Sequence, residues 1–220
     1  MATLFVVSTP IGNLADITLR AVETLKSVDI IACEDTRHTL QLLNHFEIKK
    51  TLVSYHKHSK DSKVEQIIDS IKDGKNVALV TDAGTPGVSD PGEFLIRAGL
   101  ENGIEVVPIP GVSAAVTALS ISGLNTDEFV FIGFLPHKKG RQTKLKEIAL
   151  EKRTIILYES PFRIKKLLTE LLEFVGNREV SVSRELTKKF EETYRGKISD
   201  VLPNVKEKGE FVVILEGKSD

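Results

Sequence analysis

Cysteine, aromatic residues and net charge are all scarce in this sequence, and each shortage excludes a class of protein. Cys33 is the only cysteine, so no internal disulfide can form, and a reducing compartment is indicated, which predicts a cytoplasmic location. Lysine and arginine number 30 against 31 aspartates and glutamates, so no overall field draws the chain to nucleic acid or membrane. Any contact with a polyanion must come from a local basic patch.

Long hydrophobic runs are missing as well. No apolar stretch approaches the roughly 18 residues that a membrane span needs. The first three residues lead directly into a strand-like segment, without the basic start of a signal peptide. With 220 residues, of which 41% are hydrophobic, the chain can build one large core or two small ones. We therefore expect a folded protein that makes no membrane contact.

Apolar strand-like runs alternate with helical periods along nearly the whole chain. This pattern predicts an α/β fold of βαβ units around a largely parallel sheet, with about five strands in each half. The small polar stretch at residues 122–127 predicts two lobes, residues 1–122 and 123–220, with a ligand cleft between them. The predicted strands are Thr3–Ser8, Asp29–Cys33, Thr51–Ser54, Asn76–Val80, Ile104–Ile109, Phe129–Phe134, Arg153–Tyr158, Glu179–Ser183, Glu192–Gly196 and Glu210–Leu215.

Helical spacing of apolar residues marks the helices between these strands. One helix is predicted around the apolar residues 64–71, before Gly74, and a second between Pro161 and Gly176, around the apolar residues 164–175. Ser160 and Pro161 are expected to be the N-cap and first residue of the second helix, and Gly176 its end.

The segment from Thr81 to Gly92 reads TDAGTPGVSDPG and is the most informative part of the sequence. Glycine allows positive φ and close approach to a ligand, whereas proline fixes φ at about −65°. Ligands of open α/β sheets bind beyond the carboxyl ends of the strands, and a buried strand is predicted directly before this segment. The segment therefore predicts a stiff loop that is shaped for a small polar ligand.

Four segments share this position, directly after a predicted strand. Each one alone could be an ordinary strand-to-helix turn. Because all such turns leave a parallel sheet at one edge, we expect the four to converge. They are residues 8–13, 84–92, 110–115 and 158–161.

Several familiar sites are excluded by their residues. No glycine turn has the dinucleotide fingerprint G-x-G-x-x-G, and Gly217–Ser219 has no room for the helix that a P-loop needs. His56 and His58 lack further ligands, so no metal site is predicted. Ser113 resembles a hydrolase nucleophile, but no suitable histidine and acid follow it.

The segment from His137 to Lys146 contains five lysines and arginines and no acid. A solvated helix start would explain it, but cations at a helix N-terminus oppose the helix dipole, whereas phosphate contacts would favour them. The mixed charges of Glu34–Arg37 and Arg184–Lys189 fit either surface ion pairs or substrate handling, and their place at strand ends favours the latter. We therefore predict an enzyme that acts on RNA.

The blocks that follow the strands resemble the tetrapyrrole methylase superfamily, and within it the branch that methylates small-subunit ribosomal RNA. They occur in order from residue 3 to about residue 216. The blocks are VSTPIGNL at residues 7–14, CEDTR at 33–37, TDAGTPGVSDPG at 81–92, PIPGVSA at 108–114, GFLP at 133–136, ESP at 159–161 and RELTK at 184–188.

The resemblance implies a two-lobed class III methyltransferase fold, a homodimer, and S-adenosyl-L-methionine bound between the lobes. It also implies 2′-O-methylation of a cytidine ribose in the small ribosomal subunit RNA. Two positions depart from it, because Phe162 and Phe190 stand where many relatives have histidine. The implied cofactor-binding residues are Ser8, Thr9, Pro10, Ile11, Gly12, Gly84, Thr85, Pro86, Gly87, Val88, Ser89, Asp90, Ser113, Ala114, Ala115 and Phe134.

Methyl transfer to a hydroxyl needs alignment of the reacting atoms and a base that accepts the proton. The position after strands nominates Glu159, Asp35 and Glu185 as candidate bases. Two alternatives stay open, a non-catalytic ribosome-assembly factor and a tetrapyrrole methylase, although the lack of tryptophan and the 6% of aromatic residues argue against a wide apolar substrate. The predicted contacts to RNA are Arg37, Lys138, Lys139, Arg141, Lys144 and Lys188.

Overall fold

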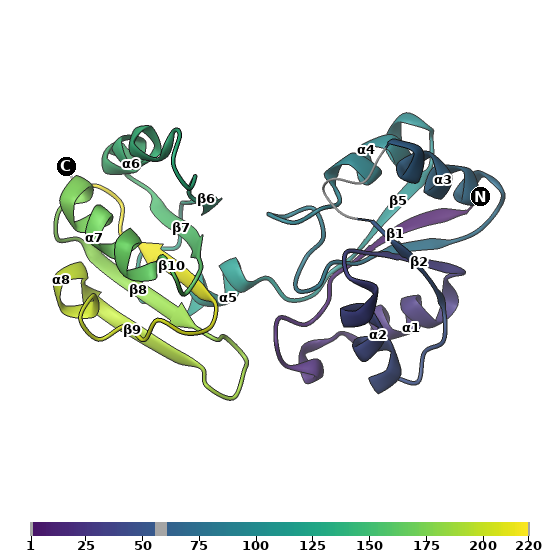
Figure 1. Cartoon of the computed structure of the whole chain (residues 1–220), viewed down its shortest axis with the longest axis horizontal. Helices are drawn as coiled ribbons and strands as arrows, with labels where there is room; N and C mark the ends of the chain where they lie inside the picture. Colours follow the sequence, from purple (N-terminus) through teal and green to yellow (C-terminus); the bar gives the residue numbers. More distant parts are fainter. Residues whose placement is uncertain (1, 56–60, 220) are drawn as a thin grey trace. The chain divides into compact units, whose positions relative to one another are not determined.

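The computed structural model describes residues 2–55 and 61–219 and divides into two units, Met1–Ser113 and Ala114–Asp220 (Figure 1). Each unit has its own five-stranded sheet. The division falls earlier than the expected boundary after residue 122, because helix α5 (Ala114–Ser120) packs on strands β7 (Thr154–Glu159) and β10 (Phe211–Leu215) of the second unit.

The first unit is built on a fully parallel sheet with the strand order β3-β2-β4-β1-β5. Each strand lies within the segment predicted for it. All three residues of β4 are buried, as expected for a strand that is covered on both faces. The strands are β1 (Thr3–Val7), β2 (Ile30–Cys33), β3 (Thr51–Ser54), β4 (Val77–Leu79) and β5 (Glu105–Ile109).

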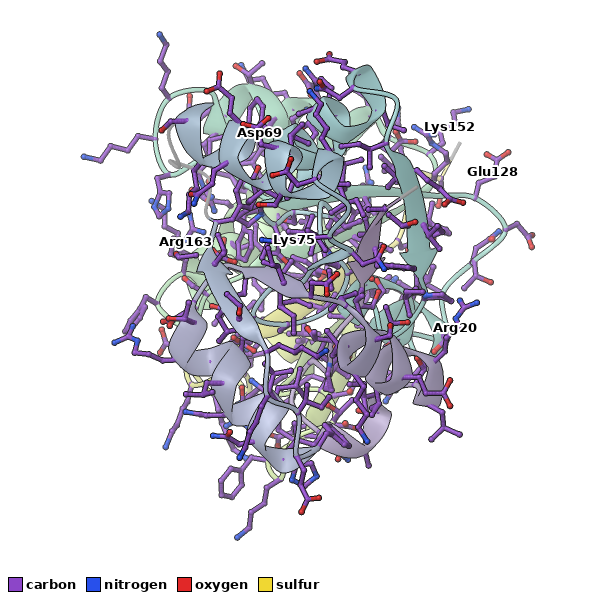
Figure 2. All side chains as sticks on the ribbon, turned by 90° about the vertical axis from the view of Figure 1, so that its right-hand side faces the viewer. Arg20, Asp69, Lys75, Glu128, Lys152 and Arg163 are labelled. Atoms are coloured by element: carbon purple, nitrogen blue, oxygen red, sulfur yellow. The ribbon has the colours of Figure 1, made fainter. Side chains whose placement is uncertain are left out.

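Four helices cover the two faces of this sheet (Figure 1). Helices α1 (Leu19–Ser27) and α2 (Thr36–His45) contribute Leu25 and Leu43 to the core on one face. Helices α3 (Asp61–Lys72) and α4 (Glu93–Glu101) cover the other face. Helix α3 buries Ile68 and leaves Asp69 on its outer side (Figure 2). A short 3-10 helix, η1 (Leu14–Asp16), follows β1.

The sheet of the second unit has the order β6-β7-β10-β8-β9 and is mostly antiparallel. Only β6 and β7 are parallel, so the expectation of a largely parallel sheet is wrong for this half. Strand β10 runs between β7 and β8 in the opposite direction, and the connection from β8 to β9 is too short for a parallel crossover. The remaining strands are β6 (Phe129–Phe134), β8 (Glu179–Arg184) and β9 (Glu192–Lys197).

Helices α6 (Arg141–Leu150), α7 (Ile164–Val175) and α8 (Ile198–Val201) complete the second core. Helix α7 ends at Gly176 as predicted, but it begins at Ile164 with Arg163 as its N-cap. Ser160 instead closes a turn, since its carbonyl accepts a hydrogen bond from the Arg163 amide at 3.1 Å. Within the described part of the chain, no helix has the length and apolar character needed to cross a membrane.

Candidate functional site

Three loops at the carboxyl edge of the first sheet are bonded to one another. Thr9, after β1, pairs with Gly84, after β4, through two backbone hydrogen bonds of 2.9 and 3.0 Å. The Ser8 hydroxyl donates to Thr85 Oγ1 at 3.2 Å, and the Thr85 hydroxyl is 3.3 Å from the carbonyl oxygen of Val112, after β5. The predicted convergence is therefore confirmed for these three loops.

Glycine is required where these loops approach most closely. A Cβ at Gly111 would lie 2.8 Å from the Ser8 Cβ, closer than such atoms pack. Gly84 adopts a φ of +82°, and a Cβ there would touch Ile11 at 3.5 Å. Backbone therefore replaces side chains where the three loops meet, which lets them pack closely against one another.

The predicted cofactor residues of this unit differ in exposure. Ser8 and Thr9 are 4% and 3% exposed and bond within the junction, so their side chains hold the loops together. Pro10, Ile11, Gly84 and Pro86 are also buried. The exposed part of the predicted set consists of Gly12, Gly87, Val88 and Ser89, with Thr85, Asp90 and Ser113 half-buried.

Asp35, a predicted base, begins helix α2 as its N-cap beside this junction. Its carboxylate accepts hydrogen bonds from the Arg37 amide at 2.8 Å and from the Arg37 guanidinium at 2.7 and 3.1 Å. The side-chain bonds first, and then the backbone bond, lower the pKa of Asp35 to about 2. A carboxylate with so low a pKa is a weak proton acceptor. Arg37, although highly exposed, already has an acidic partner.

The pKa of Asp90 is shifted in the opposite direction to that of Asp35. Burial, reinforced by the charge of Asp82, raises its pKa to about 6 despite a hydrogen bond from Thr81. The sequence placed Asp90 among the cofactor residues but did not identify it as an acid–base group. Its position before Pro91 in a glycine-rich loop was the only local signal, and burial depends on the folded chain.

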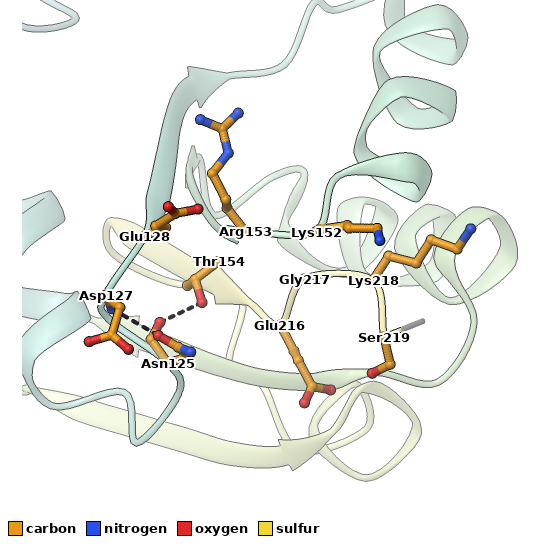
Figure 3. A pocket seen from close by; sticks show the side chains of 10 residues that line it. All are labelled: Asn125, Asp127, Glu128, Lys152, Arg153, Thr154, Glu216, Gly217, Lys218 and Ser219. Atoms are coloured by element: carbon orange, nitrogen blue, oxygen red, sulfur yellow. Dashed lines mark hydrogen bonds between the residues drawn. The ribbon is translucent and has the colours of Figure 1, made fainter.

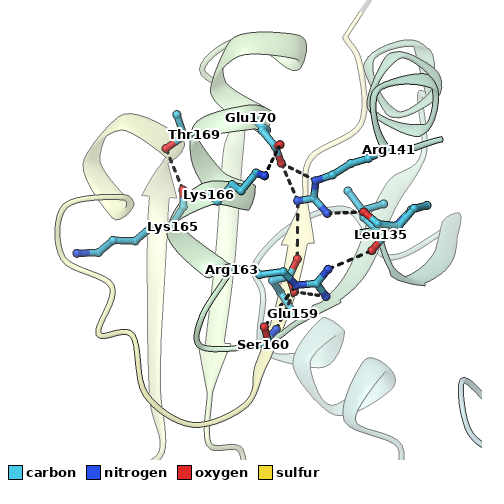
Figure 4. Close-up of polar contacts among 10 residues, drawn as sticks. Leu135, Arg141, Glu159, Ser160, Arg163, Lys165, Lys166, Thr169 and Glu170 are labelled. Carbon is cyan, nitrogen blue, oxygen red and sulfur yellow. Dashed lines mark hydrogen bonds and ion pairs between the residues drawn. The ribbon is translucent and has the colours of Figure 1, made fainter. Parts of the chain in front are cut away.

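Glu159, another predicted base, lies in a buried cluster of charges in the second unit (Figure 4). Its carboxylate is 2.7 Å from the Arg163 guanidinium and 3.9 Å from that of Arg141, and its side chain is 0% exposed. Arg141 also pairs with Glu170 at 2.6 Å. This enclosure leaves Glu159 little access to a substrate hydroxyl and makes it a structural group of the second unit.

The same cluster corrects the prediction for Arg141. Its side chain is 5% exposed, and it donates to the Pro136 carbonyl at 3.1 Å, while Arg163 is 3.4 Å from the Leu135 carbonyl oxygen. Arg141 therefore holds the loop after β6 in place and does not belong to the basic surface. Lys138 and Lys139 on that loop are exposed, and the described residues provide no acidic partner for either.

The other predicted RNA contacts have acidic partners. Lys144 pairs with Glu147, and Lys188 pairs with Glu185 at 3.2 Å and Glu210 at 2.6 Å. Burial alone would lower the pKa of Lys188, but the hydrogen bonds and charges of these two glutamates outweigh it and raise the pKa.

Glu185, the third predicted base, is held by its surroundings as well. Its carboxylate accepts a hydrogen bond from the Glu210 amide at 3.1 Å besides its pair with Lys188. Its φ of +52° is uncommon for a residue with a side chain, and Thr187 has a φ of +65°. The loop after β8 is therefore a strained and well-bonded segment, and strain of this kind concentrates at functional sites.

Three predicted cofactor residues belong to the second unit. Ala114 is the first residue of α5, and Ala115 is 6% exposed. Phe134 is 53% exposed and makes an edge contact with Tyr158, with ring centres 5.6 Å apart.

A hollow of about 460 Å³ lies at the end of the second sheet where β6 and β7 begin and β10 ends (Figure 3). It contains none of the predicted site residues. In its wall, the Thr154 hydroxyl donates to the Asn125 carbonyl at 2.6 Å, and the Asp127 amide donates to Asn125 Oδ1 at 2.8 Å. Its lining residues are Asn125, Asp127, Glu128, Lys152, Arg153, Thr154, Glu216, Gly217, Lys218 and Ser219.

Metal ligands do not gather in the described ranges, 2–55 and 61–219, where no group of three or more His, Cys, Asp or Glu residues is placed to hold an ion. His56 and His58, which were not expected to bind a metal, lie outside the described residues.

Comparison with known proteins defines the class. The family model of tetrapyrrole (corrin/porphyrin) methylases matches residues 3–202. The chain belongs to this family of methyltransferases, as its motifs predicted. Two solved structures share the fold. A diphthine synthase superposes with a TM-score of 0.75 at 13% identity, covering 98% of this chain and 90% of the other. A cobalt-precorrin-4 methyltransferase of cobalamin biosynthesis superposes with a TM-score of 0.72 at 19% identity, covering 97% and 94%.

Curated relatives at higher identity carry one particular name, ribosomal RNA small subunit methyltransferase I. The Halalkalibacterium halodurans protein is 51% identical over 99% of this chain and 77% of its own length. The Bacillus subtilis protein is 50% identical over 100% and 77%. The Thermotoga maritima protein is 45% identical over 99% of this chain and 100% of its own length.

Proposed function

We propose that this chain transfers the methyl group of S-adenosyl-L-methionine to the 2′-oxygen of a cytidine ribose in small-subunit ribosomal RNA. The proposal depends above all on the junction of the three loops after β1, β4 and β5, which is where the family resemblance puts the cofactor. The names of relatives that are 45–51% identical over nearly the whole chain support ribosomal RNA as the substrate.

The residues at the junction fit a small polar cofactor. Gly84 and Gly111 keep side chains out of the place where the loops meet, and the exposed backbone of Gly87–Ser89 can bind polar groups. When bound, S-adenosyl-L-methionine supplies an electrophilic methyl group. Ser8–Gly12, Gly84–Asp90 and Ser113–Ala115 would hold the cofactor, with Phe134 as a further predicted contact.

The hydroxyl that receives the methyl group must lose its proton. Asp90 is the best-suited described group of the first unit, because a pKa of about 6 lets it be ionised at neutral pH and still accept a proton. Asp35 and Glu185 are weaker candidates, since Arg37 and Lys188 already neutralise them. Glu159 is the weakest, because it is enclosed by two arginines.

RNA binding in this proposal depends on lysine and arginine side chains. Lys138 and Lys139 are free to bind phosphate groups, and Arg37, Lys144 and Lys188 could do so if they exchanged their acidic partners for phosphates. A homodimer stays a prediction that sedimentation equilibrium can test.

The deciding experiment uses small ribosomal subunits from cells that lack this protein. Incubation with the protein and methyl-labelled S-adenosyl-L-methionine should place label in RNA, and the labelled nucleotide should be a cytidine whose 3′ linkage resists alkali. Label on a base instead of the ribose would refute 2′-O transfer. Cofactor binding without any label would favour the non-catalytic assembly factor.

A matched pair of variants tests the cofactor site. Gly111→Ala places a methyl group against Ser8, so the loop after β5 must move away from the loop after β1, and the affinity for S-adenosyl-L-methionine should fall by about tenfold. Gly103→Asn is the control, because its site has open space and asparagine tolerates positive φ. Equal calorimetric affinities for both variants and the wild type would place the cofactor elsewhere.

A further inference from the structure

Two phenylalanines in the second unit are strongly exposed. Phe162, in the turn after β7, is 92% exposed, and Phe190, in the loop after β8, is 62% exposed. A single exposed apolar side chain is ordinary on a protein surface. Two exposed aromatic rings on neighbouring loops at one end of a sheet offer flat apolar faces on which a partner can pack.

The strand register puts both loops at the same end of the second sheet. Phe211, the first residue of β10, pairs with Glu159 on one side and with Arg184 on the other. The last residues of β7 and β8 are therefore two strand spacings apart, which is about 10 Å. Stacked nucleotide bases are only a few ångströms apart, so rings on these two loops can contact bases of the same short RNA segment.

Both loops are held in shape by hydrogen bonds. The Arg163 amide donates to the Ser160 carbonyl at 3.1 Å around Phe162. The Arg184 guanidinium donates to the carbonyl of Phe190 at 3.0 Å. A ring on a fixed loop loses little conformational freedom when it binds, which favours recognition of a partner.

Free positive charge surrounds the rings. The ammonium group of Lys189 lies 5.7 Å from the centre of the Phe190 ring. Lys138 and Lys139 extend from the loop after β6, the strand beside β7. Three acids at this end of the sheet are already paired, since Glu185 and Glu210 bind Lys188 and Glu207 binds Lys165. Glu191, beside Phe190, accepts a hydrogen bond from the Thr187 amide and has no cationic partner among the described residues. Three lysines against this one carboxylate leave the unpaired charge mostly positive.

We propose that this edge binds unpaired bases of the substrate RNA, with Phe162 and Phe190 stacking on bases and Lys138, Lys139 and Lys189 contacting phosphates. The inference rests on the proposed function and names how the RNA is held. Aromatic rings stack on bases that are not enclosed in a duplex, and cations follow the sugar–phosphate chain. The occupant is therefore single-stranded RNA, and duplex RNA should bind poorly.

The test measures the binding of a fluorescent unstructured oligoribonucleotide to the full chain, independently of methyl transfer. Phe162→Leu and Phe190→Leu keep an apolar side chain but remove the ring, and each should weaken binding by about fivefold or more. Phe162→Tyr should restore the affinity. Phe129→Leu is the matched control, because Phe129 is 43% exposed at the start of β6, the opposite edge, and should bind like the wild type.

Three results would overturn the proposal. The first is equal affinity of the two leucine variants and the Phe129→Leu control. The second is equal binding of the same oligoribonucleotide when it is annealed to its complement. The third is a shift in sedimentation of the leucine variants with unchanged RNA affinity, which would make the edge a contact between copies of the chain. Failure of methyl transfer by the wild type with RNA binding intact would instead refute the proposed function.

Discussion

Replacing Glu159 by glutamine tests whether this carboxylate is structural. Glutamine has nearly the same shape but no charge, so it leaves Arg163 without an acidic partner at 2.7 Å. Arg141 loses only the longer contact of 3.9 Å and keeps Glu170 at 2.6 Å. The perturbation is therefore the loss of one close buried pair.

The size of the effect follows from these distances. At an effective dielectric constant of about 20, attraction at 2.7 Å is about 6 kcal/mol and at 3.9 Å about 4 kcal/mol, before desolvation is subtracted. Breaking a buried pair by removing one partner costs about 3–5 kcal/mol. Because glutamine can still accept a hydrogen bond and Arg163 is 17% exposed, we expect a loss near the lower end, about 3 kcal/mol.

The assay should report on the second unit alone. Amide exchange of β7 and β10 residues as a function of urea gives the free energy of unfolding of that sheet. Glu207→Gln is the control, because its pair with Lys165 at 3.4 Å is exposed and should contribute no more than about 1 kcal/mol. If Glu159→Gln is destabilised no more than this control, the assignment of Glu159 to a buried structural cluster is wrong.

The remaining predictions concern the carboxylates of the first unit. Burial raises the pKa of Asp90 to about 6, above its ordinary 3.8, so its contribution to stability is full below about pH 4 and is lost as the pH rises through 6. In Asp90→Asn, the stability of the first unit should fall less as the pH rises. The urea midpoint of β4 amide exchange at several pH values measures this, and the same pH dependence in variant and wild type would contradict the raised pKa. The rate of methyl transfer should rise with pH to a plateau above about 6 in the wild type and fall by about a hundredfold in Asp90→Asn, whereas normal transfer by this variant would exclude Asp90 as the base. Asp35→Asn keeps a good N-cap residue, so its transfer rate should stay within about twofold of the wild type, and a large loss would restore Asp35 as the base.

Local patterns in the sequence were sufficient for the strands and for the meeting of three loops. The continuous apolar run of β4 predicted a strand covered on both faces, and Gly176 predicted the end of α7. The turns containing Thr9, Gly84 and Gly111 were predicted to meet, and they do. Such predictions succeed because burial and backbone conformation determine which residue types occur at neighbouring positions.

Pairing between distant segments was decided by the tertiary structure. The apolar runs of β7, β8 and β10 do not state in which direction each strand enters the sheet, so the antiparallel place of β10 could not be derived from them. The turn after β7 was grouped with the turns at Thr9 and Gly84 because one parallel sheet was assumed, but β7 belongs to the second sheet and β1 and β4 to the first.

The sequence by itself determined which segments are strands, where the glycine loops lie and to which family the chain belongs. Only the tertiary structure decided that Arg141 is a buried partner of Glu170, 29 residues away, and that the pKa of Asp90 is raised. The physical reason is the same in both cases. The state of a charged side chain depends on the partners and the burial that folding brings to it, and these come from residues that are remote in the sequence.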